Sequence, residues 1–224
     1  MFIKLPNILD QGKLKNINKI LSQASFIDGK LSAGSAAKKV KTNLELDQNS
    51  QQAAYLDELV VSSLSQNLMF RNATLPHKVS QPFFAKYEKG MSYGDHIDDP
   101  VTGNWPERYR TDVAVTVFLS GPEDYEGGEL VVNTSFGQTS TKLPAGDAVC
   151  YPASSLHHVS EVTKGVRLVA VLWIQSLVRD PAKRELLYEL SLAREKMLAQ
   201  APGAEETAQI DHTYTNLVRM WSEV

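Results

Sequence analysis

Two stretches of the first 75 residues carry apolar side chains at the three- and four-residue spacing of an amphipathic helix. The first stretch predicts a helix from about residue 10 to residue 24, through Leu14, Ile17, Ile20 and Leu21. The second predicts a helix that ends near Asn72, through Leu56, Leu59, Val60, Leu64 and Leu68. The polar segment 28–41 between them is typical of a loop or a frayed strand. We interpret both apolar faces as structural.

The pattern changes at Pro76, where short β-rich runs separated by turn residues replace the helical spacing. The expected strands are 82–87, 93–98, 112–119, 129–133, 139–143, 148–151, 157–162 and 166–175. The turns between them include 88–90, 126–128, 136–137 and 145–147. Short strands without intervening helices favour a double-sheet jelly roll, or double-stranded β-helix, over a parallel α/β design.

After Pro181 the helical spacing returns through Leu186, Leu187, Leu190 and Leu198, and a final helix is expected from Asp211 to Trp221. The chain is therefore predicted to be an α+β protein in three parts. Residues 1–77 form a mostly helical support region, 78–177 the jelly roll, and 178–224 a small C-terminal helical subdomain.

Composition excludes several classes of protein. With 42% hydrophobic and 22% charged residues and a net charge of −3, the chain is neither collagen-like nor strongly disordered. Its charges are interspersed, without the basic block that a nucleic-acid partner requires. The single cysteine, Cys150, lies in an apolar run and is expected to be a buried thiol, because it has no partner for a disulfide.

The N-terminus becomes polar too soon for a signal peptide, and no apolar stretch is long enough to span a bilayer. We therefore expect a cytoplasmic protein with no membrane partner.

The sharpest local signal is His96-Ile97-Asp98 at the end of an expected strand. Residues i and i+2 of a strand point to the same face, so the imidazole and the carboxylate can converge on one point. A third ligand is available from His157 or its neighbour His158, of which only one can face the same side. Two histidines and one carboxylate form the facial triad of non-haem Fe(II) oxygenases. Alone, however, H-x-D is a weak motif that occurs by chance.

Arg167 lies ten residues after His157, in the apolar run from Val166 to Trp173. An arginine in such a run requires a partner for its charge. It could occupy an edge position and pair with a surface carboxylate. Alternatively, its planar guanidinium could bind a dicarboxylate ligand through two parallel hydrogen bonds.

The order of H-x-D, histidine and arginine resembles that of the 2-oxoglutarate/Fe(II) dioxygenases of the prolyl 4-hydroxylase type. Further matching segments are 87–96, 126–130 and 143–148 together with Ser155-Leu156-His157. The whole chain is similar to the bacterial PKHD-type hydroxylases, a group often labelled PiuC-like iron-uptake factors.

This resemblance implies that His96, Asp98 and His157 bind Fe(II), with His157 preferred over His158, and that Arg167 binds the distal carboxylate of 2-oxoglutarate. Tyr87 is a weaker candidate for a hydrogen bond to this cosubstrate, or else an aromatic residue of the barrel wall. L-Ascorbate is an implied accessory. The reaction implied is hydroxylation with release of succinate and CO2, because related halogenases lack the carboxylate that Asp98 supplies.

Two other classes remain open on the residues alone: a non-redox, cupin-like metal protein acting as a sensor or isomerase, and an interaction module with a vestigial site. The substrate, a small molecule or a peptide, is not indicated. Trp105 and Arg110 follow the H-x-D pair in a turn-rich loop, so they could contact substrate, form a lid or mediate an oligomer contact. A homo-oligomer through the C-terminal helices is a further alternative.

Overall fold

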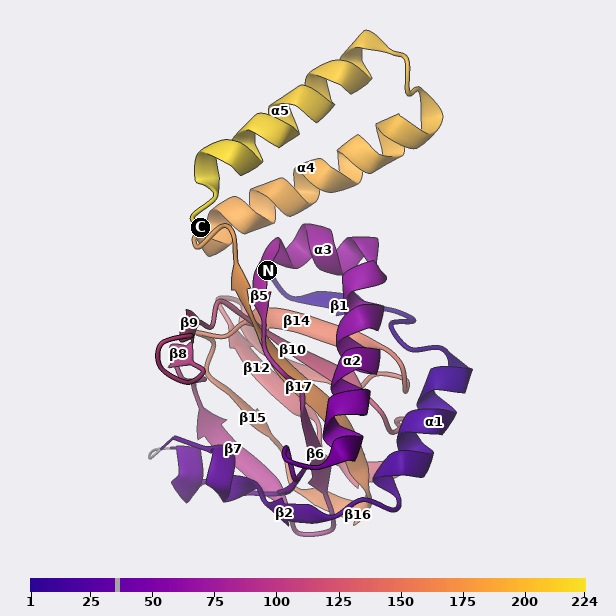
Figure 1. Cartoon of the computed structure of the whole chain (residues 1–224), viewed down its shortest axis with the longest axis vertical. Coiled ribbons are helices and arrows are strands. Elements are labelled where there is room, and N and C mark those ends of the chain that lie inside the picture. The colour runs from indigo at the N-terminus through magenta and orange to yellow at the C-terminus, as the bar shows by residue number, and fades with distance from the viewer. Residues whose placement is uncertain (35–36) are drawn as a thin grey trace.

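The computed structural model describes residues 1–34 and 37–224, and its centre is a pair of facing antiparallel sheets (Figure 1). The major sheet has eight strands in the described residues. Its order is β1 (Ile3–Leu5), β14 (Ala148–Pro152), β10 (Val113–Phe118), β17 (Arg167–Ser176), β6 (Phe83–Tyr87), β4 (Leu44–Leu46) and β2 (Phe26–Asp28), and β5 (Pro76–Val79) also pairs with β17. The jelly-roll expectation is confirmed.

The minor sheet faces the major one and has five strands among the described residues. Its order is β13 (Gly137–Thr141), β12 (Leu130–Thr134), β15 (His157–Val159), β7 (Ser92–His96) and β3 (Lys41–Thr42). Two short ribbons complete the strands: β11 (Tyr125–Gly127) with β16 (Val162–Gly165), and β8 (Val101–Thr102) with β9 (Tyr109–Arg110).

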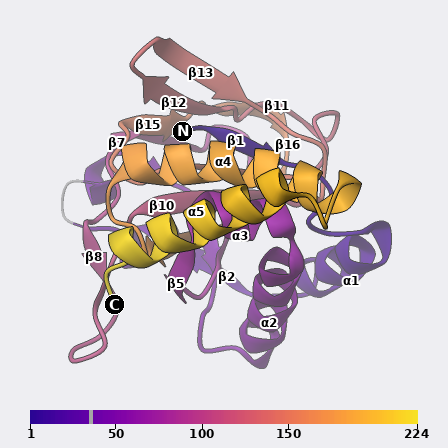
Figure 2. The same cartoon turned by 90° about the horizontal axis from the view of Figure 1, so that it is seen from above.

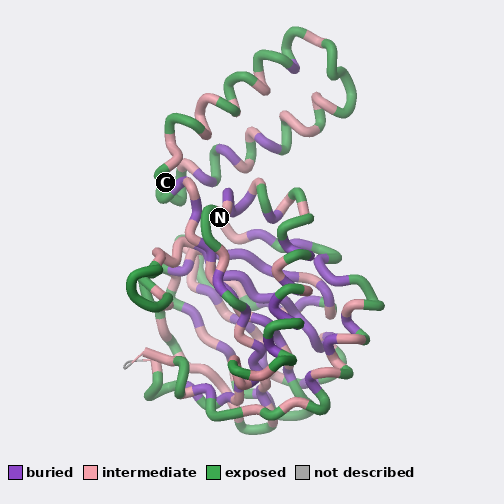
Figure 3. Tube along the Cα trace, viewed as in Figure 1, coloured by how far each residue is buried: buried purple, intermediate pink, exposed green. Residues whose placement is uncertain are grey.

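Strand β10 shows why the major sheet is buried on both faces. Val113, Val115 and Val117 belong to the apolar cluster shared with the N-terminal helices, whereas Ala114 and Phe118 belong to the cluster between the two sheets. Successive residues of a strand point to opposite faces, so this alternation separates an outer core from an inner one. Figure 3 shows the burial of these central strands.

The outer face is covered by α1 (Gln11–Leu21) and α2 (Gln51–Gln66), which contribute Ile17, Leu56 and Val60 to the outer core. Cys150 belongs to the same core, and its burial raises the pKa of its thiol, as expected for an inert cysteine. No described helix has both the length and the apolar character needed to cross a membrane.

The second predicted helix is interrupted at Asn67. This residue ends α2 in an extended conformation, and its side chain accepts a hydrogen bond from the backbone N–H of Phe70 at 2.9 Å. The cap starts a separate helix, α3 (Leu68–Thr74). The expected continuous helix to Asn72 is therefore wrong, because a capping interaction outweighs the continued apolar spacing.

The polar segment 28–41 contains two 3-10 helices, Gly29–Ser32 and Ala37–Lys39, between β2 and β3; its residues 35 and 36 lie outside the described residues. The strands that follow, β3 and β4, add to the minor and the major sheet respectively. The N-terminal region thus supplies strands to both sheets as well as helices to the outer face.

The C-terminal segment forms an antiparallel helical hairpin that projects beyond the sheets (Figure 1) and is seen from above in Figure 2. It consists of α4 (Pro181–Gln200) and α5 (Glu205–Trp221). The last helix therefore begins earlier than the expected Asp211. Near its base, Leu187 packs with Leu75 and Val178 in a small apolar cluster.

Candidate active site

Three potential metal ligands converge on the inner face of the minor sheet. One ligand atom from each of His96, Asp98 and His157 lies within 4.8 Å of the others, and His157 Nε2 is 3.8 Å from Asp98 Oδ1. His96 ends β7 and pairs in register with His157 on β15, so the ladder places the two imidazole rings side by side, with centroids 4.2 Å apart. The three predicted ligands therefore lie together, but β7 ends at His96, so Asp98 follows the strand and does not lie on it as the expected strand 93–98 implied.

Backbone contacts set the proton positions of both histidines. His96 Nδ1 lies 2.8 Å from the Gly94 carbonyl oxygen, and His157 Nδ1 lies 2.9 Å from that of Ser155. A carbonyl oxygen can only accept, so each Nδ1 carries the hydrogen. The Nε2 lone pairs are then free to bind a metal, with the rings held in place by the same contacts.

Electrostatics keep this cluster suited to a cation. Burial, with a smaller contribution from His157, lowers the pKa of His96 from 6.5 to about 4, so the ring is neutral near pH 7. Burial raises the pKa of Asp98, an effect that His157 partly opposes. The buried Oδ2 of Asp98 has no hydrogen-bond partner among the described residues. Neutral imidazoles beside an orphaned carboxylate oxygen fit a divalent transition metal such as Fe(II).

His158 lies on the other side of the strand. Its Nδ1 is 2.8 Å from Asp95 Oδ1, and its side chain is 27% exposed, compared with 5% for His157. The structure therefore brings His157, rather than His158, to His96 and Asp98, in agreement with strand alternation.

Arg167 begins β17 and is only 1% exposed. No carboxylate of the described residues forms an ion pair with it, and its Nε has no hydrogen-bond partner there. Its guanidinium lies 5.0 Å from the ring centroid of Tyr87 and 5.8 Å from that of Phe118. The edge-position explanation is wrong, because β17 is flanked by β10 and β6. A buried cation without an anion fits an anionic ligand, and 2-oxoglutarate has this chemistry.

The surroundings of Arg167 explain the roles of Tyr87 and of the glycine pair 127–128. Tyr87 is its register partner on β6, and burial raises the pKa of the Tyr87 phenol to about 12, so the phenol stays a hydrogen-bond donor. Gly128, with φ +66°, lies so close that an added Cβ would be 3.1 Å from Arg167 Cδ. The glycine pair 127–128 therefore allows the turn to pack against the arginine.

One cavity of about 120 Å³ joins these parts, and the metal cluster, Arg167 and Tyr87 all line it. Sequence reasoning missed part of its wall. Three further residues line the cavity: Lys41 on β3, Glu45 on β4, and Asn43 between the two strands. Trp173 lines it as well, and its buried Nε1 lacks a partner among the described residues.

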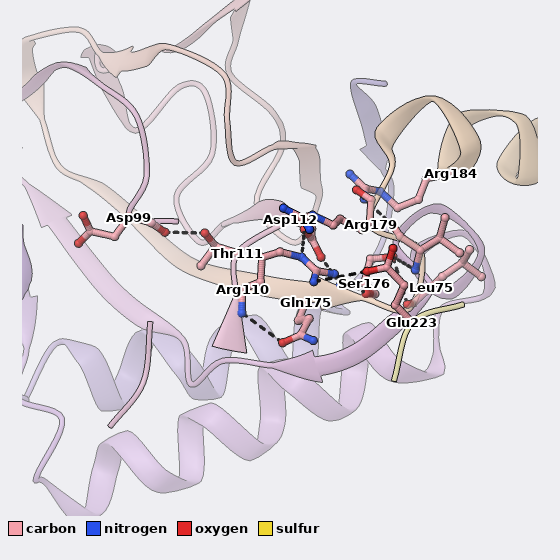
Figure 4. Close-up of polar contacts among 11 residues, drawn as sticks. Leu75, Asp99, Arg110, Thr111, Asp112, Gln175, Ser176, Arg179, Arg184 and Glu223 are labelled. Carbon is pink, nitrogen blue, oxygen red and sulfur yellow. Dashed lines mark hydrogen bonds and ion pairs between the residues drawn. The ribbon is translucent and has the colours of Figure 1, made fainter. Parts of the chain in front are cut away.

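The two loop residues named as possible substrate contacts lie outside this cavity lining. Trp105 is 82% exposed. Arg110 instead binds neighbouring protein groups: its Nε is 2.7 Å from Asp112 Oδ1, and its Nη2 donates to the Ser176 carbonyl at 3.4 Å (Figure 4). Arg110 is thus a structural residue at the base of the C-terminal hairpin.

Solved structures share this fold at low sequence identity. A prolyl hydroxylase from Trichoplax adhaerens, in complex with a hypoxia inducible factor peptide fragment, gives a TM-score of 0.55 at 18% identity, covering 83% of this chain and 86% of that one. The epimerase SnoN of nogalamycin biosynthesis, described as non-heme and alpha-ketoglutarate dependent, also gives 0.55, at 15% identity, covering 79% of this chain and 78% of that one. These likenesses establish the fold.

Sequence comparison establishes the family. Residues 82–175 match the 2OG-Fe(II) oxygenase superfamily, and residues 181–223 match the PKHD-type hydroxylase C-terminal domain. A PKHD-type hydroxylase of Thioalkalivibrio sulfidiphilus is 50% identical, and one of Saccharophagus degradans is 41% identical, each over 100% of both chains. The cupin-like alternative is therefore not supported. The chain belongs to the PKHD-type hydroxylases and is a 2-oxoglutarate-dependent Fe(II) dioxygenase.

Proposed function

We propose that His96, Asp98 and His157 hold the Fe(II) and that Arg167, assisted by Tyr87, holds the distal carboxylate of 2-oxoglutarate. One observation carries this assignment: a buried guanidinium that forms no ion pair with any described carboxylate lines the same cavity as the His-Asp-His cluster. The cluster matches the donor set of a facial triad, and the guanidinium matches a carboxylate in charge and geometry.

The protein residues bind and orient, and the bound groups supply the oxidation. When bound, Fe(II) and 2-oxoglutarate would supply the oxidising chemistry for hydroxylation by dioxygen, with succinate and CO2 as the products of the cosubstrate. Arg167 and Tyr87 fix the cosubstrate at its far carboxylate, while Leu130 and Val159 keep part of the cavity wall apolar. Asp98 supplies the third protein ligand, which favours hydroxylation over halogenation.

Calorimetry tests the two halves of the site separately. Mn(II), as a redox-inert probe, should bind the wild-type protein and Arg167→Met with similar affinity, whereas His96→Ala should bind it at least ten-fold more weakly. 2-Oxoglutarate should then bind the Mn(II)-loaded wild type and lose at least ten-fold in affinity in Arg167→Met. Unchanged 2-oxoglutarate binding in Arg167→Met would contradict the assignment of the arginine.

Several wider predictions accompany this function. We expect a cytoplasmic enzyme that acts on a small molecule or a peptide, with no nucleic-acid or membrane partner. L-Ascorbate should support its turnover by keeping the iron ferrous. The link to iron uptake and the formation of a homo-oligomer stay predictions. Among them, the ascorbate requirement is the simplest to measure, as the decline of succinate formation with time in its absence.

A further inference from the structure

Exposed residues among those that line the cavity mark its open end. Ser32, Ile97 and Asp99 line the cavity and are exposed, whereas Arg167, which also lines it, is only 1% exposed. These three residues are here called the mouth, and a substrate would pass them on its way to the metal cluster. Asp99 is the charged member of this set.

Asp99 follows the metal ligand Asp98 directly, and its position is defined by contacts with two other segments. Its backbone carbonyl accepts a hydrogen bond from the Thr111 hydroxyl, and its carboxylate points away from this contact (Figure 4). The carboxylate lies against Gly34, because a Cβ added to that glycine would be 2.8 Å from Asp99 Oδ1 and 2.9 Å from Oδ2. Thr111 and Gly34 both line the cavity, so the carboxylate lies between two parts of its wall.

Asp99 has no counterion among the described residues, since none of their lysine, arginine or histidine side chains forms an ion pair with it. Ser35 and Ala36, which lie outside the described residues, carry no charge. Exposed carboxylates without a counterion are common on protein surfaces. The location of Asp99 on the wall of the cavity gives this one its significance.

The other charges of the cavity wall cancel once metal and cosubstrate are bound. Lys41 Nζ lies 2.5 Å from Glu45 Oε1, so this pair is internally neutral. In the proposed site, the distal carboxylate of 2-oxoglutarate neutralises Arg167. The two charges of Fe(II) are balanced by Asp98 and by the second carboxylate of the cosubstrate. Asp99 therefore leaves the loaded cavity with one uncompensated negative charge, at the end where substrate enters.

We propose that Asp99 is a specificity-determining residue that binds a cationic group of the hydroxylation substrate, a protonated amine or a guanidinium, at the mouth of the cavity. The inference rests on the proposed function, because the charge balance includes Fe(II) and 2-oxoglutarate. A cation at this position makes the loaded cavity neutral, and the surrounding walls strengthen its attraction to Asp99 relative to open water. A free small molecule and a peptide side chain can both supply such a cation.

The test compares cations with alcohols of matched shape. Pentylamine and pentylguanidine are each compared with pentanol, and N-acetyl-lysine N-methylamide is compared with its analogue that has a hydroxyl in place of the ammonium. Each probe is added to protein loaded with Mn(II) and 2-oxoglutarate, and Mn(II)-induced relaxation of the probe protons in solution NMR reports binding near the metal. We expect at least one cation to bind at least three-fold more tightly than its alcohol, a modest preference because the ion pair is partly exposed.

Two variants of Asp99 test whether its charge is the cause. The preference for cations should disappear in Asp99→Asn, which keeps the shape of the side chain but removes the charge. In Asp99→Lys the preference should reverse, so that the hexanoate anion binds more tightly than pentylamine. A purely structural role of Asp99 would not produce this reversal. A preference shown by the free amines identifies a small molecule as the better source of the cation, and one shown by the lysine derivative alone identifies a peptide.

Controls separate this inference from the proposed function. Glu107→Gln removes the same charge at an exposed position outside the cavity lining and should keep the preference for cations. 2-Oxoglutarate affinity, measured by calorimetry, should stay within two-fold in Asp99→Asn but fall in Arg167→Met. Equal binding of cations and alcohols by the loaded wild type, including no binding of either, overturns this inference and leaves the proposed function intact. A preference that persists in Asp99→Asn, or that is lost equally in Glu107→Gln, overturns the assignment to Asp99. A wild type that binds neither Mn(II) nor 2-oxoglutarate contradicts the proposed function, and this inference with it.

Discussion

At the scale of single residues, the site is defined by polar groups that lack partners. Asp98 Oδ2, Arg167 Nε and both amide atoms of Asn43 are buried without hydrogen bonds among the described residues. Buried polar groups are usually satisfied in native proteins, so the unpartnered atoms of residues that line the cavity are candidates for ligand binding. The Asp98 carboxylate suits a cation, whereas the Arg167 guanidinium suits an anion.

Replacing Arg167 by methionine should separate binding from stability. The guanidinium is desolvated and forms no ion pair within the described parts of the chain. Arg167→Met should therefore leave the ligand-free protein at least as stable as the wild type, with an unfolding free energy higher by about 1 kcal/mol or more. Adding 2-oxoglutarate with Mn(II) should raise the melting temperature of the wild type but not of the variant beyond the effect of Mn(II) alone. A strongly destabilised variant would instead indicate that the arginine serves the fold.

The neutral imidazole of His96 predicts a pH dependence of stability. Its pKa is about 4 in the folded protein and 6.5 in the unfolded chain, so only the unfolded chain takes up this proton between these values. The unfolding free energy of the metal-free protein should therefore fall as pH decreases through this window, by about 3 kcal/mol in total. The raised pKa of Asp98 acts in the opposite direction, with stability lost as pH rises.

Urea unfolding at several pH values between 4 and 7 measures this effect. Comparison with His96→Gln, which cannot take up the proton, isolates the histidine from Asp98 and from the remaining carboxylates. The unfolding free energy of His96→Gln should change less with pH than that of the wild type. Identical slopes for both proteins would mean that His96 is not held neutral by the fold.

At the scale of elements, the alternation of strand residues explains what sequence reasoning could predict. His96 and His157 lie on neighbouring strands of the minor sheet, and Arg167 interrupts an apolar run at the start of a central strand. Apolar periodicity and turn residues make such strands visible. Lys41, Asn43 and Glu45 were missed because β3 and β4 have only two and three residues, which is too short for a clear periodic signal. Their segment was interpreted as part of a loop or frayed strand, or left unassigned.

Element boundaries were missed for a similar reason. Asn67 starts a new helix within an unbroken apolar spacing, so the local cap overrides the periodic signal. The last helix begins at Glu205, where the preceding Ala204 makes no side-chain capping bond, and a helix start without a capping residue is hard to recognise in sequence.

The junction between β17 and the C-terminal hairpin depends on Arg184. This α4 residue is 3% exposed, and its Nη1 donates to the carbonyls of Val178 at 2.7 Å and Arg179 at 2.8 Å. Arg184→Leu should lower the unfolding free energy by about 2–3 kcal/mol, because both carbonyls lose a charged donor. Hydrogen exchange should increase first in the hairpin, whereas 2-oxoglutarate affinity should stay unchanged. Arg179→Leu, at an exposed position, is the matched control and should have little effect on the unfolding free energy or on hydrogen exchange in the hairpin.

At the scale of the whole molecule, the site depends on a sheet that is buried on both faces. The outer core under α1 and α2 supports the strands that carry Arg167 and Tyr87 on their inner side. The outer face of these strands therefore contributes mainly to stability, and their inner face to ligand binding. This division explains why a long N-terminal region accompanies the catalytic fold.

Leu56 of α2 tests this division, since it is fully buried in the outer core. Leu56→Ala should lower the unfolding free energy by about 2–5 kcal/mol through lost burial and a residual cavity. The protein that remains folded should bind 2-oxoglutarate with wild-type affinity. Gln52→Ala, an exposed change on the same helix, serves as the control for the denaturant midpoint. A loss of cosubstrate affinity without a loss of stability in Leu56→Ala would contradict the separation of the two faces.

The most direct test of the central claim is succinate formation from 2-oxoglutarate by the purified protein, reloaded with Fe(II) without oxygen and then exposed to air. We predict slow succinate production without added substrate, and its loss in Asp98→Ala and in Arg167→Met, both of which remain folded by circular dichroism. Succinate formation that persists at the wild-type rate in either variant would contradict the assignment of metal and cosubstrate to these residues.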